Sequence, residues 1–367
     1  MGGWIHTFLY YSVVALYTCN IAGIVLYNRR PTMAKHDVNH EAIVHGLQKD
    51  KRATDRKYQG LLRELARKNR ELGAAMEIRN NVETFHIRPE KRSASSEATF
   101  FMVASDWHVA EEVTKGQVNG LNEYNLEIAE KRANTFFFRG HKLLRIFKKD
   151  ISIKTVVLPL LGDFISNSIH EELMESNLLP PIDETIFAQR LIASGIEYLL
   201  EDKSIRSIIV PCHSGNHART TKDRRIATER GNSLEYFMYH SLKLHFKNEP
   251  RVHFLIAEGY HSYLDVYGYA IRLHHGHQVS YGGGVGGLTI PLNKAIAQWN
   301  KVKRVDLDIL GHFHNFFDGG NFIVNGSLIG WNSFALSIKA SYEPPKQALF
   351  LIDKRRFKTI VAPILFS

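Results

Sequence analysis

A run of apolar residues ends in a triplet whose side chains could hold a metal ion. Residues 99–104 have the composition of a buried β-strand, and Asp106 and His108 follow where that strand should reach the surface. A carboxylate oxygen and an imidazole nitrogen two residues apart are both ligands for a divalent cation. A solvated turn is the alternative interpretation of a single triplet of this kind.

Four more clusters of ligand-type residues follow runs of strand composition. Alone, a Gly-Asp pair is typical of a turn, Gly-Asn-His of a loop, and paired histidines of a hydrogen-bonded surface. Five such clusters at five strand ends make coincidence improbable, so we interpret them together as one metal site. The clusters contain Asp106 and His108; Asp163; Asn216 and His217; His274, His275 and His277; and His312 and His314.

Strands alternate with helices in the region that carries these clusters. This alternation favours an α/β fold, a four-layer αββα sandwich of two mixed β-sheets flanked by helices, with an N-terminal helical appendage. Functional groups then gather at the sheet edge where the strands end. The last part of the chain looks more antiparallel and has little helix. We predict strands at 99–104, 155–161, 207–210, 252–257, 267–273 and 306–310, helices at 125–147 and 184–201, and antiparallel runs at 322–324, 334–338 and 348–352.

The motif order D-x-H, G-D, G-N-H, H and G-H-x-H resembles that of the calcineurin-like metallophosphoesterase superfamily over about residues 98–353. The order is similar to that of the nuclease branch containing the Mre11 and SbcD proteins, and to metallophosphoesterases encoded by tailed phages. The resemblance implies two divalent metal ions, with manganese the first choice and iron, nickel or zinc as alternatives. It further implies that Asp106, His108 and His314 hold one metal, that Asn216, His275 and His312 hold the other, that Asp163 bridges them, and that His217 is the catalytic acid.

Two positions depart from the superfamily pattern. Ala218 stands where an acid commonly follows Gly-Asn-His, and Ser166 or Asn167 stands where the Gly-Asp motif has a second acid. Neither position ligates metal directly, so we expect metal binding to be kept and the groups that orient the ligands to differ. His275 is preferred over His274 because the superfamily histidine commonly precedes a glycine, but both are candidates.

The chemistry of such a site is phosphate ester hydrolysis. Two cations that share a carboxylate clamp a phosphate and turn a water into hydroxide, which attacks phosphorus while His217 protonates the leaving oxygen. Arg219 and Lys222 follow that histidine and are candidates for binding a substrate phosphate; a solvated basic loop is the alternative. Residues 281–287 are rich in glycine, which suits an anion-binding backbone, a lid or a plain turn.

The net charge of +10 indicates an anionic partner: nucleic acid, a phosphorylated small molecule or an acidic membrane surface. Our leading hypothesis is therefore a phosphodiesterase acting on DNA or RNA. The alternative is a phosphatase or pyrophosphatase acting on a small nucleotide, a phosphoprotein or a lipid-linked substrate. A non-catalytic scaffold is disfavoured because every ligand-type position is kept. Cys19 and Cys212 are the only cysteines, so no disulfide framework is expected and a reducing compartment fits best.

The N-terminal segment has two alternative interpretations. Residues 4–27 carry no charged side chain other than His6 and precede Arg29 and Arg30, which suits a membrane span with the following chain in the cytoplasm. A misassigned upstream extension, with translation starting at Met33, is the alternative. We predict an apolar segment at 1–32, a basic helical region and linker at 33–97, and a cytoplasmic metallophosphoesterase domain at 98–367.

Overall fold

The computed structural model describes residues 49, 60, 84–89, 96–281 and 287–366. All but Lys49 and Gly60 belong to the compact unit Ala75–Ser367. The apolar segment 4–27 and most of the glycine-rich stretch 281–287 therefore lie outside the described residues, as does nearly all of the basic region. Within the described part of the chain, every helix is too short or too polar to cross a bilayer. The predicted domain limits stay predictions.

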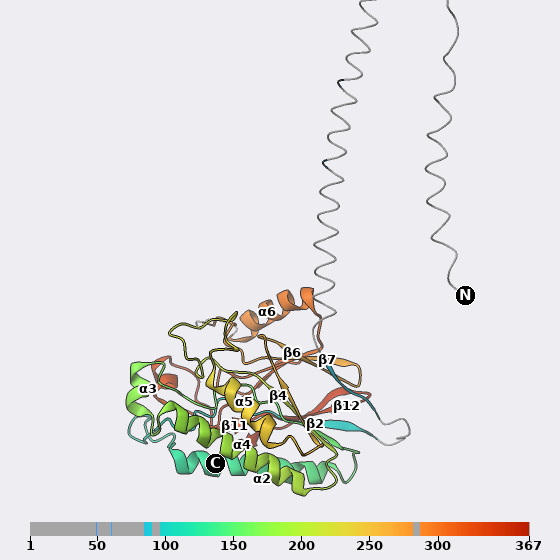
Figure 1. Ribbon diagram of the computed structural model, residues 1–367, viewed down its shortest axis with the longest axis horizontal. Helices are drawn as coiled ribbons and strands as arrows, with labels where there is room; N and C mark the ends of the chain where they lie inside the picture. The colour runs from blue at the N-terminus through green and yellow to red at the C-terminus, as the bar shows by residue number, and fades with distance from the viewer. Residues whose placement is uncertain (1–48, 50–59, 61–83, 90–95, 282–286, 367) are drawn as a thin grey trace, which may run out of the picture. The chain divides into compact units, whose positions relative to one another are not determined.

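Two six-stranded mixed sheets form the centre of this unit, as predicted (Figure 1). The first has the order β13-β12-β2-β3-β4-β5, in which β2, β3, β4 and β5 are parallel. The second has the order β1-β6-β7-β8-β10-β9, in which β7, β8 and β10 are parallel. A separate pair joins β11 and β14. The strands are β1 Thr84–Ile87, β2 Ala98–Met102, β3 Thr155–Val157, β4 Ser207–Cys212, β5 Val252–Ile256, β6 Ser262–Val266, β7 Tyr269–Leu273, β8 Leu307–Leu310, β9 Phe317–Asp318, β10 Phe322–Val324, β11 Lys346–Gln347, β12 Leu349–Asp353, β13 Phe357–Val361 and β14 Ile364–Leu365.

Helices cover the outer faces of both sheets and complete the predicted four layers. Side chains of α2, α4 and α5 pack with the first sheet, and α6 packs on the second. In Figure 1, α2 and α4 lie on one side of the sheets and α6 lies on the other. The helices are α2 Leu126–Phe147, α3 Glu171–Ser176, α4 Pro181–Glu201, α5 Leu234–His245, α6 Thr289–Val302 and α7 Ser333–Ser337.

Strand β2 shows why these residues build layers. Phe100 and Met102 pack in the cluster under the helices, whereas Phe101 and Val103 pack between the two sheets. Side chains of a strand point to alternate faces, so a continuous apolar run is stable only where both faces are covered. Burying each such side chain contributes roughly 1.5–3 kcal/mol. The end of β2, from which the chain leads to Asp106, is therefore fixed from both sides.

Some elements differ from the prediction. Residues 334–338 were expected to be extended, but α7 forms there because the Asn332 side chain accepts a hydrogen bond from the Ala335 amide at 3.0 Å and caps the helix. The predicted strand 267–273 is the second arm of a hairpin, β6 and β7, whose turn places Tyr267 and Gly268 in the left-handed region. Several other elements were not anticipated: strands β1, β6, β9, β11, β13 and β14 and helices α3, α5 and α6.

Candidate metal centre

The loops that follow β2, β3, β4, β7 and β8 bring the predicted side chains together. Three groups have ligand atoms that all lie within 4.8 Å of one another. Two residues, His108 and Asp163, each belong to two groups, so the three groups form one continuous cluster. These buried and half-buried side chains could hold metal ions. The groups are Asp106, His108 and His314; His108, Asp163 and His217; and Asp163, His275 and His312.

The first group sets two imidazole nitrogens against a carboxylate. Nε2 of His108 lies 3.2 Å from Nε2 of His314, which lies 3.4 Å from Oδ1 of Asp106. Nδ1 of His108 faces the Ser166 hydroxyl at 3.2 Å. Burial, followed by the imidazoles of His217 and His314, lowers the pKa of His108 well below its usual value. The ring is therefore neutral and offers a lone pair, which fits a divalent cation shared with the carboxylate.

The second group is built around His275. Its Nδ1 donates to the Leu161 carbonyl at 2.6 Å, and its Nε2 lies 3.0 Å from Oδ2 of Asp163 and 3.3 Å from Oδ1 of Asn216. A backbone acceptor on one ring nitrogen fixes the orientation of the other, as is usual for metal-binding histidines. Although burial opposes it, the charge of Asp163 raises the pKa of His275 to about 10. The same negative charge on Asp163 would also attract a metal cation.

The neighbouring His274 points away from this cluster. Its Nδ1 lies 3.4 Å from the Tyr260 hydroxyl and its Nε2 lies 3.6 Å from Oδ1 of Asp308. None of the three ligand groups among the described residues includes it. Of the two candidates that the sequence left open, the geometry therefore favours His275.

The backbone at the ligands adopts a conformation that costs free energy. Left-handed φ angles cost roughly 1 kcal/mol or more per residue, although Asp and His tolerate them better than most residues. Such outliers persist only where the surrounding structure imposes them, and they concentrate at functional sites. Five ligand residues have them: Asp106 at 56°, His108 at 45°, Asp163 at 54°, His312 at 72° and His314 at 53°.

Two motif glycines allow the loops to approach this closely. A Cβ on Gly215 would lie 2.0 Å from Oδ1 of Asp163, and a Cβ on Gly311 would lie 2.4 Å from Oδ2 of Asp106. Any larger residue would have to displace the carboxylate or the loop. Glycine is therefore required on steric grounds in the G-N-H and G-H-x-H motifs. This requirement does not depend on the order of the motifs along the chain.

Sequence reasoning missed Glu235, which is buried in the first turn of α5. One carboxylate oxygen accepts from the Phe164 amide at 2.6 Å and the other accepts from the Gly215 amide at 2.8 Å. The side chain therefore joins the loop of Asp163 to the loop of Asn216. Burial, reinforced by the charge of Asp163, raises the pKa of Glu235 to about 8.

Glu184, buried in the first turn of α4, has the same kind of role and was also missed. It accepts from the amides of Ser166 at 2.6 Å, Asn167 at 2.9 Å and Ala110 at 3.4 Å. Burial raises its pKa to about 7. An acidic residue on the apolar face of the predicted helix 184–201 is the signal that could have identified Glu184. Glu235 lies on α5, which the sequence did not predict.

The positions that depart from the superfamily pattern orient His217. Its Nδ1 donates to the Ser166 carbonyl at 3.0 Å, and its carbonyl accepts from Nδ2 of Asn167 at 2.8 Å. Its amide donates to Oδ1 of Asp163 at 2.8 Å. Burial lowers the pKa of His217. His217 is also close enough to His108 and Asp163 to act as a ligand.

The two candidate phosphate-binding residues lie differently. Nη1 of Arg219 donates to the carbonyl of Asn216 at 2.6 Å, so this guanidinium borders the cluster. Lys222 is exposed, and its carbonyl accepts from Arg219 at 3.4 Å. Arg219 is therefore placed beside the metal ligands, whereas the Lys222 side chain reaches solvent.

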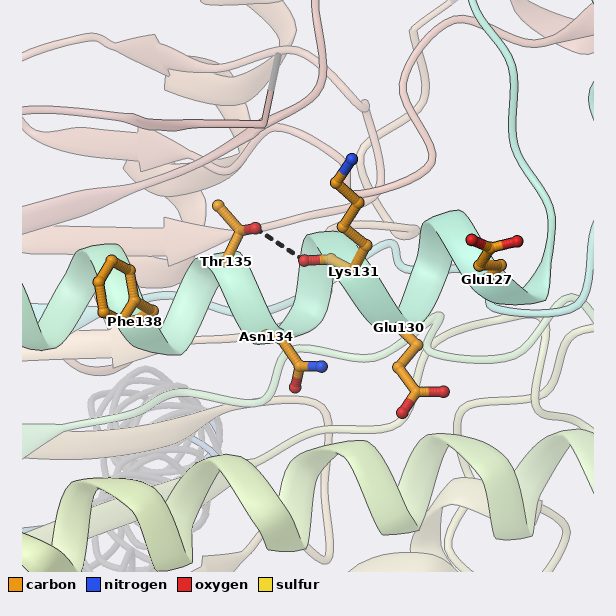
Figure 2. A pocket seen from close by; sticks show the side chains of 6 residues that line it. All are labelled: Glu127, Glu130, Lys131, Asn134, Thr135 and Phe138. Carbon is orange, nitrogen blue, oxygen red and sulfur yellow. Dashed lines mark hydrogen bonds between the residues drawn. The ribbon is translucent and has the colours of Figure 1, made fainter.

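A shallow hollow of about 620 Å³ lies apart from the cluster, along the exposed face of α2 (Figure 2). Its lining includes Glu130, Lys131 and Phe138, and the Thr135 hydroxyl on the same face donates to the Lys131 carbonyl at 2.7 Å. None of its described lining residues belongs to the three ligand groups. We therefore assign the hollow no part in the chemistry.

Fold and site together define a two-sheet α/β protein with a buried Asp/His cluster suited to metal ions. No protein-family profile matches the sequence, and no curated protein matches it. Among solved structures, the chain is similar to a hypothetical protein of Pyrococcus horikoshii OT3, at 13% identity and a TM-score of 0.36, over 73% of this chain and 87% of that one. It is also similar to Vps29 of Chaetomium thermophilum, at 12% identity and a TM-score of 0.28, over 72% of this chain and 94% of that one.

Proposed function

We propose that this protein is a calcineurin-like metallophosphoesterase that hydrolyses phosphodiester bonds, with DNA or RNA as its substrate. The observation that carries the proposal is the continuous ligand cluster, in which His108 and Asp163 each serve two groups. Nitrogen and oxygen ligands without sulfur suit manganese, iron, nickel or zinc, and manganese is our first choice. When bound, a pair of such cations would supply Lewis acidity at the phosphate.

The ligands divide into two sets that share one carboxylate. Asp163 lies in the group with His108 and in the group with His275, which supports a bridging role between two cations. In this proposal the remaining ligands to the first cation are Asp106, His108 and His314, and those to the second are Asn216, His275 and His312. The buried carboxylate of Glu235 keeps the two loops in register through their amides.

His217 acts on the leaving group in this proposal. Its Nδ1 is engaged by the Ser166 carbonyl, so Nε2 is the atom available to the substrate. Burial lowers the pKa of His217, while an anionic phosphate beside the ring favours its protonated form. The protonated ring donates to the departing oxygen. Arg219, and Lys222 from solvent, offset the charge of the substrate.

The test is a substrate survey with the purified full chain. Manganese, iron, nickel and zinc are each added, and turnover is measured on single-stranded DNA, duplex DNA, RNA, cyclic nucleotides and a series of aryl phosphates. We expect hydrolysis of diesters to exceed that of monoesters. Inactivity toward every phosphate ester with all four metals would refute the proposal.

Salt dependence separates a nucleic-acid substrate from a small one. Binding through several phosphates weakens steeply as salt rises, whereas binding through one phosphate responds weakly. We expect KM for single-stranded DNA to rise by roughly fiftyfold between 50 and 200 mM salt if about four phosphates are contacted. A KM that hardly changes with salt would instead indicate a small nucleotide or another substrate with one phosphate.

A further inference from the structure

We infer that a pocket beside the metal centre binds a second phosphate of the substrate, adjacent to the phosphate that is hydrolysed. The inference rests on the proposed function and narrows its substrate class. It concerns the arginine loop, residues 219–232, which follows the metal-ligand motif that ends in His217. The ligand chemistry is a second phosphate group of the same substrate, joined to the scissile phosphate across one nucleoside, as in a polynucleotide, or through a single oxygen, as in a pyrophosphate.

The pocket adjoins the ligand cluster. Asn216, whose Oδ1 lies 3.3 Å from Nε2 of His275, is part of its wall. Arg219, Arg224 and Arg225 also line it. The space between the side chains holds little more than a water molecule, and Arg224 and Arg225 are exposed. An anion therefore enters as these two side chains turn toward solvent, and it then lies directly beside the metal ligands.

The charges that line the pocket favour an anion. Nη1 of Arg219 is held by the Asn216 carbonyl, and Nη1 of Arg224 is held by the His277 carbonyl at 3.3 Å. Burial and then the charge of Arg224 lower the pKa of Arg219, so the two guanidinium groups are close enough to repel each other. Arg225 has no ion-pair partner in the described part of the chain. A phosphate between these groups would relieve the repulsion.

Two acidic residues must be counted against these arginines. Glu229 lines the pocket, with Oε1 3.6 Å from Nε2 of His277, and burial raises the pKa of Glu229 to about 7. Asp223 acts on Arg219 from the exposed side of the loop. Three guanidinium groups outweigh these two carboxyls, so the pocket keeps a net positive charge.

A buried and unsatisfied nitrogen provides an independent observation. His277 lines the pocket and is only 8% exposed, yet its Nδ1 has no hydrogen-bond partner within the described residues. An unpaired buried polar atom costs roughly 1–3 kcal/mol. A ligand oxygen in the pocket would complete its hydrogen bonding. The combination of paired arginines and an unsatisfied buried imidazole points to a ligand and not to a solvated loop.

The first experiment compares two substrates that differ by one phosphate. These are the p-nitrophenyl ester of thymidine 5′-phosphate with and without a 3′-phosphate. We expect the 3′-phosphate to raise kcat/KM of the full chain by about tenfold or more, and the double variant R224Q/R225Q to lose most of that ratio. The control is Arg190→Gln on α4, whose side chain is exposed and pairs with Glu130 at 3.5 Å. It should keep the ratio.

The second experiment needs no turnover and distinguishes the sources of the second phosphate. Calorimetry measures the binding of inorganic phosphate and pyrophosphate to the manganese-loaded chain. If the chain binds pyrophosphate about tenfold more tightly than phosphate, and R224Q/R225Q removes this preference, the pocket binds closely spaced phosphates. If only the 3′-phosphate ester shows a gain, in kcat/KM, the pocket binds the phosphates of a polynucleotide. The inference is overturned if neither second phosphate gives a gain, or if the double variant keeps the gain.

The two experiments also separate this inference from the proposed function. Failure of wild-type protein to hydrolyse either ester with any of the four metals counts against the phosphoesterase activity. The calorimetric preference and its loss in R224Q/R225Q still decide the pocket in that case. Equal losses in kcat/KM for both esters would overturn the pocket while leaving the phosphoesterase intact.

Discussion

The loops that carry the metal ligands and the arginine loop lie side by side but are held in opposite ways. The backbone around Asp163 and Asn216 is held by the buried Glu235, and Asp163 is kept in a left-handed conformation. Most backbone hydrogen bonds of the arginine loop stay within the loop, such as the one from the Thr220 amide to the Asn232 carbonyl at 2.9 Å. Most of its side chains are exposed. If the proposed function holds, a rigid set of metal ligands beside an adaptable phosphate-binding loop would suit a substrate that must be aligned and then released.

Among substitutions in the loops that carry the predicted metal ligands, removal of the shared Asp163 carboxylate should have the largest effect. Asp163→Ala should lose the metal pair and reduce turnover by at least about a thousandfold, because both ligand groups lose their common member. Metal content is measured by mass spectrometry after dialysis, with Asp150→Ala, a substitution remote from the motifs, as control. Two tightly bound metals in Asp163→Ala would contradict the bridging role.

Removing His217 should separate chemistry from metal binding. We expect His217→Ala to retain its metals and to lose about 100- to 10,000-fold in kcat on an alkyl diester, because the leaving oxygen then lacks a proton donor. The loss should be smaller for a nitrophenyl ester, since nitrophenolate leaves without protonation. Undiminished hydrolysis of the alkyl diester would remove this histidine from the mechanism.

Glu235 tests whether the rigidity itself matters. Glu235→Gln keeps one acceptor oxygen and leaves the Phe164 or the Gly215 amide without its partner. Metal affinity should fall by roughly 10- to 100-fold while the ligands remain in place. A metal titration against the exposed control Glu130→Gln measures the effect. Equal affinities in both variants would show that the carboxylate does not position the loops.

The smallest expected effect is on stability. Burial raises the pKa of Glu184 to about 7 and that of Glu235 to about 8, both above the ordinary value of 4.5. Raised carboxyl pKa values stabilise the fold fully below pH 4.5, and that contribution is lost as the pH rises through 7 and 8. Below pH 6.5 the lowered pKa values of His108 and His217 act in the opposite direction, so urea unfolding of metal-free protein should show a falling free energy of unfolding from pH 7 to 9. A constant value would contradict the prediction.

The sequence predicted the layers and the ligand cluster better than the parts that support them. Asp106 stands two residues before His108, and both Asp106 and Asp163 directly follow apolar runs, so short-range patterns marked them. Glu235 binds amides 71 and 20 positions away, and no local pattern reports such contacts. Strand β1 was missed because its four residues are held by pairing with the distant β6. The choice between His274 and His275 required knowing which ring faces Asp163.

The contact of Gly215 with Asp163 has a consequence for recognising active relatives of this protein. A single methyl group at that position would occupy the place of the carboxylate oxygen, although every residue able to bind metal would still be present in the chain. A count of ligands along an alignment would score such a protein as intact. The geometry of this site therefore depends as much on an absent side chain as on the side chains that could hold metal ions.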